Sequence, residues 1–326
     1  MPLLPPARFE FDDPPAATLA ALERLEDVLD EGIPRKRAGE NLLIATWNIK
    51  ALARVTKRWT STESDSPKRN LQDLCCIATV ISHFDVVALV EIKRELEALR
   101  FLMAILGSKW GFIVSDVTEG TGGNSERLGF IFNLDRVRPS GMAGELVIPD
   151  DELKLSDAVL REQFDRTPYK VSFASGEEAF TLVSLHIVWG DRPSDRAPEL
   201  GGFARWMRDH AEDEDEFNRN LIALGDFNID RMGDPNWNAF VIENGLSPPA
   251  ELLELPRTVG DTEDRHSFFD QIAWFDDGQF SALSLDYRTA GAFIWDRHLL
   301  EGIPQTRKEA RISDHYPLWA EFGLSA

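Results

Sequence analysis

The stretch Leu221-Ile-Ala-Leu-Gly-Asp-Phe-Asn228 decides how the rest of the chain is interpreted. Its first four residues form a short apolar run, which is typical of a buried strand. The carboxylate of Asp226 and the carboxamide of Asn228 follow at the tip of this strand, and both are oxygen donors of the kind that Mg²⁺ or Mn²⁺ prefers. An Asx turn would use the same residues, so the stretch alone favours a metal site and a turn equally.

Outward from this stretch, the chain alternates between short apolar runs and longer segments with helical spacing. The runs predict further strands at 42–47, 86–90, 112–116, 128–132, 170–173, 181–187, 268–275 and 318–322. Apolar residues recurring every three or four positions predict helices at 17–31, 71–84, 96–106, 203–217 and 236–243. Strands mixed with helices in this way indicate an α/β layered domain.

Composition bounds the class of protein. With 326 residues, 43% of them hydrophobic, the chain can build one large core or two small ones. No stretch approaches the roughly 18 to 20 apolar residues of a membrane span, so no membrane association is expected. The two cysteines, Cys75 and Cys76, are adjacent and cannot form an ordinary disulfide. Residues 1–15 lack the basic start and apolar run of a secretory signal, which together with the cysteines predicts a cytoplasmic protein.

The chain divides into an N-terminal extension, 1–40, and a catalytic domain, 41–326. The extension holds the predicted helix 17–31 and a basic linker, Pro34-Arg-Lys-Arg-Ala-Gly39. So short a basic run is more often a solvated connector than a nucleic-acid contact, and both remain open.

The formal net charge of −21 excludes a broad electropositive surface that binds nucleic acid by neutralising phosphates. A polyanionic substrate must therefore be held locally, which bound metal ions can achieve because they invert the local field. The acidic balance also leaves room for a regulatory protein partner.

Two further oxygen donors follow apolar runs, as Asp226 does. Asn48 comes directly after 42–47, and Glu91 comes directly after 86–90. Each could be a metal ligand, but an Asn or Glu at a strand end more often forms a turn or caps the next helix. The placement of polar groups at strand ends matches where open α/β architectures build their sites.

Two histidines, His186 and His315, stand out among the six. His186 lies near the end of the predicted strand 181–187, where a lone histidine is usually a hydrogen-bonded core residue unless a partner activates it. His315 follows Asp314 directly before the last strand, so one side chain can bind metal while the other handles a proton. The remaining histidines, in helical or loop contexts, are interpreted as structural.

Asp270 shares a strand face with Phe268, Ile272 and Trp274. If that face is buried, an unpaired carboxylate would cost several kcal/mol, so Asp270 needs a histidine or another donor. If the face lies at a sheet edge, the carboxylate is simply solvated.

Together these motifs resemble the endonuclease/exonuclease/phosphatase superfamily, most closely its deoxyribonuclease I branch. Any one motif is common by chance, but seven occur in the order of the family. The matching segments are Thr46-Trp-Asn48, Val90-Glu91, Asn124-Ser-Glu126-Arg127, Leu185-His186, Gly225-Asp-Phe-Asn228, Phe269-Asp270-Gln-Ile272 and Ser313-Asp-His-Tyr-Pro317.

The resemblance implies a four-layer α/β sandwich, in which two packed mixed β-sheets are flanked by helices, and phosphodiester hydrolysis assisted by Mg²⁺, with Mn²⁺ as an alternative. By the same resemblance, the metal and the scissile phosphate would be surrounded by Asn48, Glu91, Asp226, Asn228 and Asp314. The proton-transfer pairs would be His186 with Glu126 and His315 with Asp270, with His315 expected to activate water. The substrate phosphate would be contacted by Lys93, which stands where the family has an arginine, and by Arg127.

Three departures from the family narrow the function. Val90 replaces a frequent glutamine, and Lys50 replaces the acid of the abasic-site endonuclease branch. The minor-groove tyrosine of deoxyribonuclease I has no counterpart before Glu126. The missing tyrosine disfavours groove reading of duplex DNA. From the deoxyribonuclease-like pairs Glu126–His186 and Asp270–His315, we predict a metal-dependent nuclease, most simply an endonuclease, that acts on DNA or RNA. The alternatives are a phosphatase or phosphodiesterase of a small or lipid substrate, such as an inositol phosphate, sphingomyelin or a nucleotide, and a catalytically silent interaction module.

Overall fold

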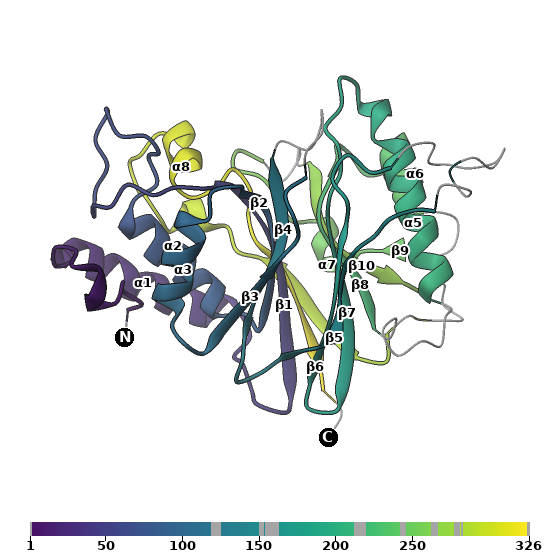
Figure 1. The fold of residues 1–326 in the computed structure, drawn as a ribbon, viewed down its shortest axis with the longest axis horizontal. Helices are drawn as coiled ribbons and strands as arrows, with labels where there is room; N and C mark the ends of the chain where they lie inside the picture. The colour runs from purple at the N-terminus through teal and green to yellow at the C-terminus, as the bar shows by residue number, and fades with distance from the viewer. Residues whose placement is uncertain are drawn as a thin grey trace.

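The structure is a computed structural model that describes residues 2–118, 125–149, 153, 163–211, 220–241, 246–261, 267–276, 281 and 283–324. Within these residues, the strands form two six-stranded mixed sheets that pack together with helices on their outer faces (Figure 1). The first sheet has the order β11 (Asp286–Ala292), β12 (Leu318–Gly323), β1 (Asn41–Leu52), β2 (Val86–Lys93), β4 (Glu126–Asn133) and β3 (Trp110–Val114). The second has the order β5 (Arg138–Glu145), β6 (Tyr169–Ser175), β7 (Glu178–His186), β8 (Leu221–Ile229), β10 (Phe268–Phe275) and β9 (Leu246–Ser247). The predicted four-layer α/β sandwich is confirmed.

Each sheet contains one parallel pair of strands at its centre, β1 with β2 and β7 with β8. A parallel pair needs a long crossover, and helices supply it here. α2 (Leu71–Ser82) lies between β1 and β2 in the chain, and α5 (Ala197–Ala211) lies between β7 and β8. In each pair the register sets the strand ends side by side, with Asn48 opposite Val90 and His186 opposite Asp226.

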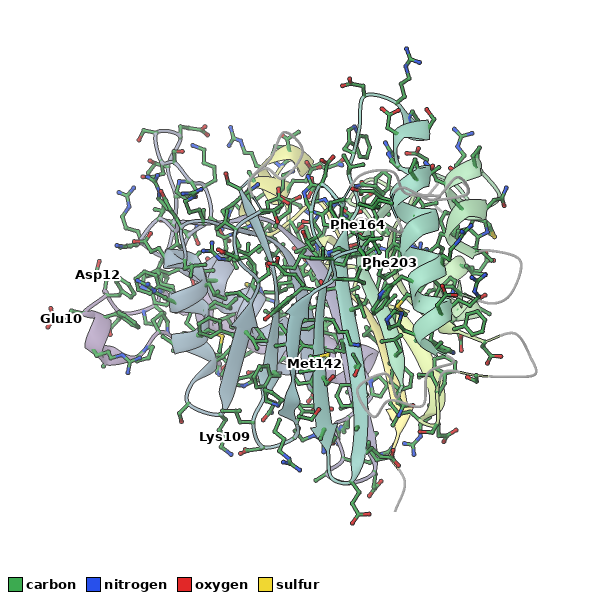
Figure 2. All side chains as sticks on the ribbon, turned by 45° about the vertical axis from the view of Figure 1, so that its right-hand side comes forward. Glu10, Asp12, Lys109, Met142, Phe164 and Phe203 are labelled. Carbon is green, nitrogen blue, oxygen red and sulfur yellow. The ribbon has the colours of Figure 1, made fainter. Side chains whose placement is uncertain are left out.

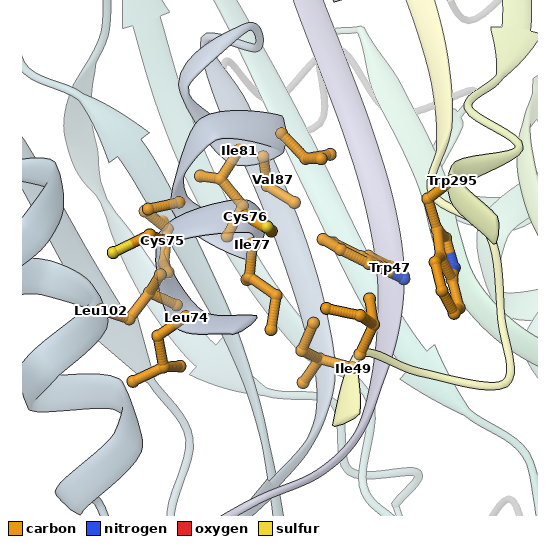
Figure 3. Close-up of a cluster of buried hydrophobic side chains, with 14 of the residues drawn as sticks. Trp47, Ile49, Leu74, Cys75, Cys76, Ile77, Ile81, Val87, Leu102 and Trp295 are labelled. Carbon is orange, nitrogen blue, oxygen red and sulfur yellow. The ribbon is translucent and has the colours of Figure 1, made fainter. Parts of the chain in front are cut away.

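β1 is buried on both faces because a sheet packs on one side of it and helices pack on the other. Leu42 and Ile44 contribute to the core between the two sheets, whereas Leu43 and Trp47 contribute to the core under the helices. Figure 3 shows this outer core, where Ile77 of α2 and Trp295 approach Trp47 from different segments. The second sheet has an equivalent outer core, which includes Phe203 of α5 and Phe164, a residue that precedes β6 (Figure 2).

Cys75 and Cys76 are buried in α2 as free thiols, as predicted. Burial raises the pKa of the Cys75 thiol to about 12, so it stays protonated and unreactive at neutral pH. In the part of the chain that the structure describes, no helix is long and apolar enough to cross a bilayer.

The predicted N-terminal helix is α1 (Ala16–Gly32), and it packs on the outer core of the first sheet through Leu22, Leu25 and Leu29. In the basic linker, Lys36 donates hydrogen bonds to the carbonyl oxygens of Ser82 (2.5 Å) and Phe84 (3.3 Å). This lysine therefore joins the linker to the end of α2. A domain boundary at residue 40 remains a prediction.

All the predicted strands are present, but several of them continue further than expected. β8 was expected to end at Leu224 and instead runs through Asp226 and Asn228 to Ile229, and β1 runs on to Leu52. Strands β5, β9 and β11 were not predicted, because the first and third are rich in Gly and exposed polar residues and the second has two residues.

All five predicted helices are also present, with bounds that differ in places from the predicted ones. α3 (Glu97–Leu106) and α6 (Pro235–Val241) begin within a residue of their predicted starts, while α5 begins six residues before 203. The predicted ends of the last two, 212–217 and 242–243, lie outside the described residues. The short helices α7 (Ala250–Leu253) and α8 (Gln305–Arg311) were not predicted.

Candidate active site

The predicted site residues meet where the two parallel strand pairs end. Asn48 of β1 donates from Nδ2 to Glu91 Oε1 of β2 (3.0 Å) and to Asp226 Oδ2 of β8 (3.1 Å). Glu91 belongs to the first sheet and Asp226 to the second. A single carboxamide therefore bridges the two sheets at the centre of the site.

The backbone is strained at this place. Lys50, Ala51, Glu91 and Asn228 have φ between 45° and 63°, a left-handed conformation that residues other than glycine rarely adopt. Such strain persists only where the surroundings impose it, and it is common at functional sites. Here the Ala51 amide donates to Glu91 Oε2 at 2.9 Å, which ties two of the strained segments together.

Gly225 is required by the same local geometry. Its φ is +141°, and a Cβ there would overlap the carbonyl oxygen of Leu185 on the neighbouring strand. The close approach of β7 to β8 brings Asp226 opposite His186.

Arg69 fixes the loop that follows Asn48. Its buried guanidinium donates from Nη2 to the carbonyl oxygens of Ile49 (2.8 Å), Lys50 (2.9 Å) and Ile312 (2.7 Å). Burial lowers the pKa of Arg69 to about 10, which still leaves it charged at neutral pH. The arginine therefore joins the strained end of β1 to the segment that precedes Asp314.

The first histidine, His186, lies against Glu126 of β4. Its Nδ1 is 3.0 Å from Glu126 Oε2, and both side chains are buried. Two further cations contact the same carboxylate, with Lys93 Nζ at 2.7 Å from Oε1 and Arg166 Nε at 3.2 Å from Oε2. Burial alone would raise the pKa of Glu126, but the contacts with His186, Lys93 and Arg166 outweigh it and lower the pKa to about 2.

The second histidine, His315, lies against Asp270 of β10, with 2.5 Å between Nδ1 and Oδ2. Asp270 is fully buried, and burial raises its pKa to about 6. For His315, burial acts to lower the pKa, but the carboxylates of Asp270, Asp226 and Asp314 outweigh it and raise the pKa to about 10. The alternative that Asp270 is solvated at a sheet edge is thus wrong, because β10 lies inside its sheet and His315 is the partner that the buried carboxylate needed.

Three hydrogen bonds fix the segment that carries His315. The indole nitrogens of Trp47 and Trp295 both donate to its carbonyl oxygen, each at 3.0 Å, and Ser313 Oγ accepts from its amide at 3.0 Å. The imidazole is therefore positioned by its own backbone as well as by Asp270.

Both imidazoles approach one oxygen. Asp226 Oδ2 lies 3.7 Å from His186 Nε2 and 4.0 Å from His315 Nε2. Burial would raise the pKa of Asp226, but the two histidines outweigh it and the pKa is lowered. Asp226 thus carries a negative charge between two groups that can each exchange a proton.

The remaining acid, Asp314, has one oxygen in use and one free for a ligand. Oδ2 accepts from Lys50 Nζ at 2.7 Å. Oδ1 is buried and has no hydrogen-bond partner among the residues that the structure describes. A second group of donor atoms, from Glu91, Glu126 and His186, lies within 4.8 Å of one another. Hard oxygen donors and an unpaired buried carboxylate oxygen fit a divalent cation.

A model of the endonuclease/exonuclease/phosphatase family matches residues 45–315, a range that includes every site residue described above. The chain belongs to this family. Members of the endonuclease/exonuclease/phosphatase family hydrolyse phosphoester bonds and typically use a divalent metal.

Relatives and solved structures agree with this membership. A deoxyribonuclease of Thioalkalivibrio sp. (strain K90mix) is 24% identical over 293 residues, which cover 86% of this chain and 71% of that protein. The structure of the Bacteroides thetaiotaomicron mannosyl-6-phosphatase Bt3783 matches with a TM-score of 0.55 and 16% identity, over 86% of this chain and 99% of that one. D. rerio TDP2 complexed with a single-strand DNA product matches with a TM-score of 0.54 and 15% identity, over 86% of this chain and 98% of that one. At these identities the two structures show a shared fold.

Within the family frame, the structure brings together all but one of the side chains predicted from the sequence. Those that converge are Asn48, Glu91, Lys93, Glu126, His186, Asp226, Asn228, Asp270, Asp314 and His315. Arg127 is the exception, because it follows Glu126 in β4 and so points to the opposite face, where it donates to the carbonyl oxygen of Arg94 at 3.5 Å. Asn124, part of the same motif, lies outside the described residues.

Two basic residues of the site were not predicted, Arg69 and Arg166. Neither lies in a motif of the family or after a predicted strand, and an isolated arginine in a loop gives no pattern from which burial could be inferred. Two of the histidines interpreted as structural, His83 and His210, have local partners: His83 Nδ1 lies 2.9 Å from the Thr79 carbonyl oxygen, and His210 Nδ1 lies 2.9 Å from that of Trp206. His266 lies outside the described residues.

Proposed function

We propose that this protein is a divalent-metal-dependent nuclease that cleaves DNA or RNA internally by attack of water on a phosphodiester. The observation that carries the proposal is the convergence of two histidine–carboxylate pairs on Asp226 Oδ2, within 4.0 Å of each Nε2. The deoxyribonuclease relative, at 24% identity, supports nucleic acid as the substrate.

Phosphodiester hydrolysis needs one proton removed from water and one given to the leaving oxygen. The Asp270 contact raises the pKa of His315 to about 10, so this imidazole holds a proton at neutral pH. We assign His315 to the leaving oxygen and His186 to the water, which reverses the roles expected from the sequence. Glu126 and Asp270 would orient the two rings through their Nδ1 atoms.

The metal would be held by Glu91 and Asp314, with Asn48, Asp226 and Asn228 around it and the scissile phosphate. Bound Mg²⁺ or Mn²⁺ would supply positive charge to the phosphoryl oxygens. Asn228 is held for such a role, since its Nδ2 donates to the Ile187 carbonyl oxygen at 2.6 Å and its amide donates to Asp226 Oδ1 at 3.0 Å. Of the two proposed phosphate contacts, Lys93 is the one that lies in the site, against Glu126.

The test is to incubate the purified protein with circular plasmid, single-stranded DNA, RNA and a panel of phosphomonoesters, first with Mg²⁺ and then with EDTA. We expect nicking and linearisation of the plasmid or internal cuts in the single strands, lost in EDTA and restored by Mg²⁺ or Mn²⁺. The His186→Ala variant should lose this cleavage, and the matched variant His210→Ala should keep it, because His210 lies in α5 and contacts Trp206.

Three outcomes would contradict the proposal. Phosphate release from monoesters without any cleavage of polymers would indicate a phosphatase of small substrates. Inactivity on every substrate would indicate an interaction module. Cleavage that persists in EDTA would exclude the metal.

A further inference from the structure

Trp189 is an exposed aromatic residue that the structure nevertheless holds in place. It follows β7 by three residues, and 51% of its surface is accessible to solvent. The guanidinium of Arg196 lies over its ring at 4.0 Å from the centroid, and Arg196 Nε donates to the Trp189 carbonyl oxygen at 2.8 Å. Arg196 is itself buried and donates from Nη1 to the carbonyl oxygen of Asn228 at 2.6 Å. The indole is therefore tied to the backbone of a proposed site residue.

Phe269 connects this indole to the proton-transfer machinery. Its ring packs against Trp189 edge to face, with 5.7 Å between centroids and 75° between planes. The Phe269 ring also lies 6.1 Å from the imidazole of His315, measured between ring centroids. Three rings thus form a row that leads from the exposed indole to His315.

The surroundings of this row favour an uncharged ligand surface over a phosphate. Phe269 lines a cavity of about 840 Å³, whose wall also contains the acids Asp230, Asp234 and Asp261. Arg231 is the basic residue in that wall, and the whole chain carries a formal charge of −21. A phosphate group would be repelled here, whereas the flat face of a base has no such penalty and gains from aromatic contact.

We propose that the exposed indole of Trp189, held in place by Arg196 and Phe269, is a stacking platform for one unpaired base of single-stranded DNA or RNA, next to the phosphate that is cut. The proposal rests on the proposed nuclease function. A base inside a duplex has both faces covered by its neighbours, so only an unpaired base can place a face on the platform. A fixed platform also suits an acidic protein, because stacking supplies affinity that does not depend on neutralising phosphates.

The experiment removes the indole from the protein and, separately, one base from the substrate. Cleavage by the parent and by Trp189→Ala is measured as kcat/KM on a single-stranded oligonucleotide, and then on copies in which one nucleotide beside the cut lacks its base. Base–aromatic stacking predicts a loss of about 5- to 150-fold for Trp189→Ala on the complete strand. Removing the stacked base should lower kcat/KM of the parent by a similar factor. It should lower kcat/KM of Trp189→Ala little further, because this variant already lacks the indole on which the base stacks.

Two further variants keep the result interpretable. Trp206→Ala is the matched control, since Trp206 lies in α5 and stacks on His210, and it should leave kcat/KM unchanged. Trp189→Phe keeps an aromatic face at the site and should retain most of the activity even if Trp189→Ala folds poorly.

The outcomes separate this inference from the function on which it rests. A parent that cleaves no nucleic acid overturns both. A parent that cleaves nucleic acid, together with a Trp189→Ala variant that is unchanged on single strands, overturns only the platform. The platform is likewise overturned if Trp189→Ala loses the same factor on complete and base-free strands, or loses as much on duplex as on single-stranded DNA.

Discussion

The two halves of this protein share one strand pattern and use it differently. In the first sheet the order β12-β1-β2-β4 is antiparallel, parallel and antiparallel, and β6-β7-β8-β10 repeats that pattern in the second. Corresponding strands carry corresponding acids: Glu91 on β2 matches Asp226 on β8, and Glu126 on β4 matches Asp270 on β10. Each of the last two acids reaches across to a partner attached to the other sheet, Glu126 to His186 and Asp270 to His315.

The halves differ in the basic residue that stands three positions before the matching strand. Before β12 this residue is His315, and before β6 it is Arg166. Arg166 places a permanent positive charge beside Glu126, and together with His186 and Lys93 it lowers the pKa of Glu126 to about 2. Asp270, which burial holds at a pKa of about 6, instead contacts a group that can release its proton. One strand pattern has thus produced a histidine–carboxylate pair with a permanent positive charge beside it, and a second pair in which the histidine itself occupies the position of that arginine.

Removing the imidazoles should give the largest effect. His315→Ala and His186→Ala should each lower kcat by about 100- to 10,000-fold, because each removes one of two proton transfers. The measurement is steady-state cleavage of the preferred substrate, with thermal unfolding as a check on folding. If one variant keeps nearly full activity, the two pairs are not both catalytic and the comparison fails.

Arg166→Met should have the next largest effect, on stability. Arg166 and Glu126 are each 4% exposed in their side chains, so the substitution leaves a buried carboxylate without its permanent partner. We expect the free energy of unfolding to fall by about 3 kcal/mol, near the lower end for a broken buried pair because Lys93 still contacts Glu126. Urea denaturation measures this, and Arg231→Met is the matched control. Equal stability of the two variants would show that Arg166 is not a charge partner.

The contributions of Glu126 and His315 to stability should change with pH in opposite directions. Because the pKa of Glu126 is lowered to about 2, its contribution is present above about pH 4.5 and is lost as the pH falls. Because the pKa of His315 is raised to about 10, its contribution is present below about pH 6.5 and is lost as the pH rises through 10. In EDTA, the stability difference between the parent and Glu126→Gln should therefore narrow toward acid, and that for His315→Gln should narrow toward alkali. If the stability differences of Glu126→Gln and His315→Gln from the parent both narrow toward acid, or both toward alkali, the two histidine–carboxylate pairs do not differ in this way.

The Lys50–Asp314 pair should show the smallest effect. Both side chains are about one third exposed, and exposed pairs contribute little. Lys50→Met should change the free energy of unfolding by about 1 kcal/mol or less in urea denaturation. A loss as large as that of Arg166→Met would mean that burial is not what separates the two pairs.

Much of the fold was predictable because its central strands are apolar on both faces and end at polar motifs. β1, β2, β8 and β10 were found for this reason, and the structure brings Asn48, Glu91, Asp226 and Asp270 of their motifs close together. Outer strands such as β5 and β11 escaped prediction, because one face is solvated and their residues do not form an apolar run.

The partners of the site were predictable only where a motif marked them. The pairing of His315 with Asp270 follows from the need of a buried carboxylate for a donor, together with the family resemblance. The contacts of Arg166 and Arg69 depend on the packing of loops against strand ends far away in the chain. Such contacts have no local period, so composition and spacing cannot reveal them.

The carbonyl oxygen of His315 accepts two indole hydrogen bonds, from Trp47 in β1 and from Trp295 in η4 (Trp295–Arg297). If this segment moved, two buried donors would lose their acceptor together, at a cost of about 1–3 kcal/mol for each. The turn that carries Asp314 and His315 is thus held in place through a single peptide group. The active site is therefore assembled before a substrate binds. Because Trp47 and Trp295 are two of the nine tryptophans in the chain, intrinsic fluorescence can report whether their hydrogen bonds to the His315 carbonyl oxygen are intact.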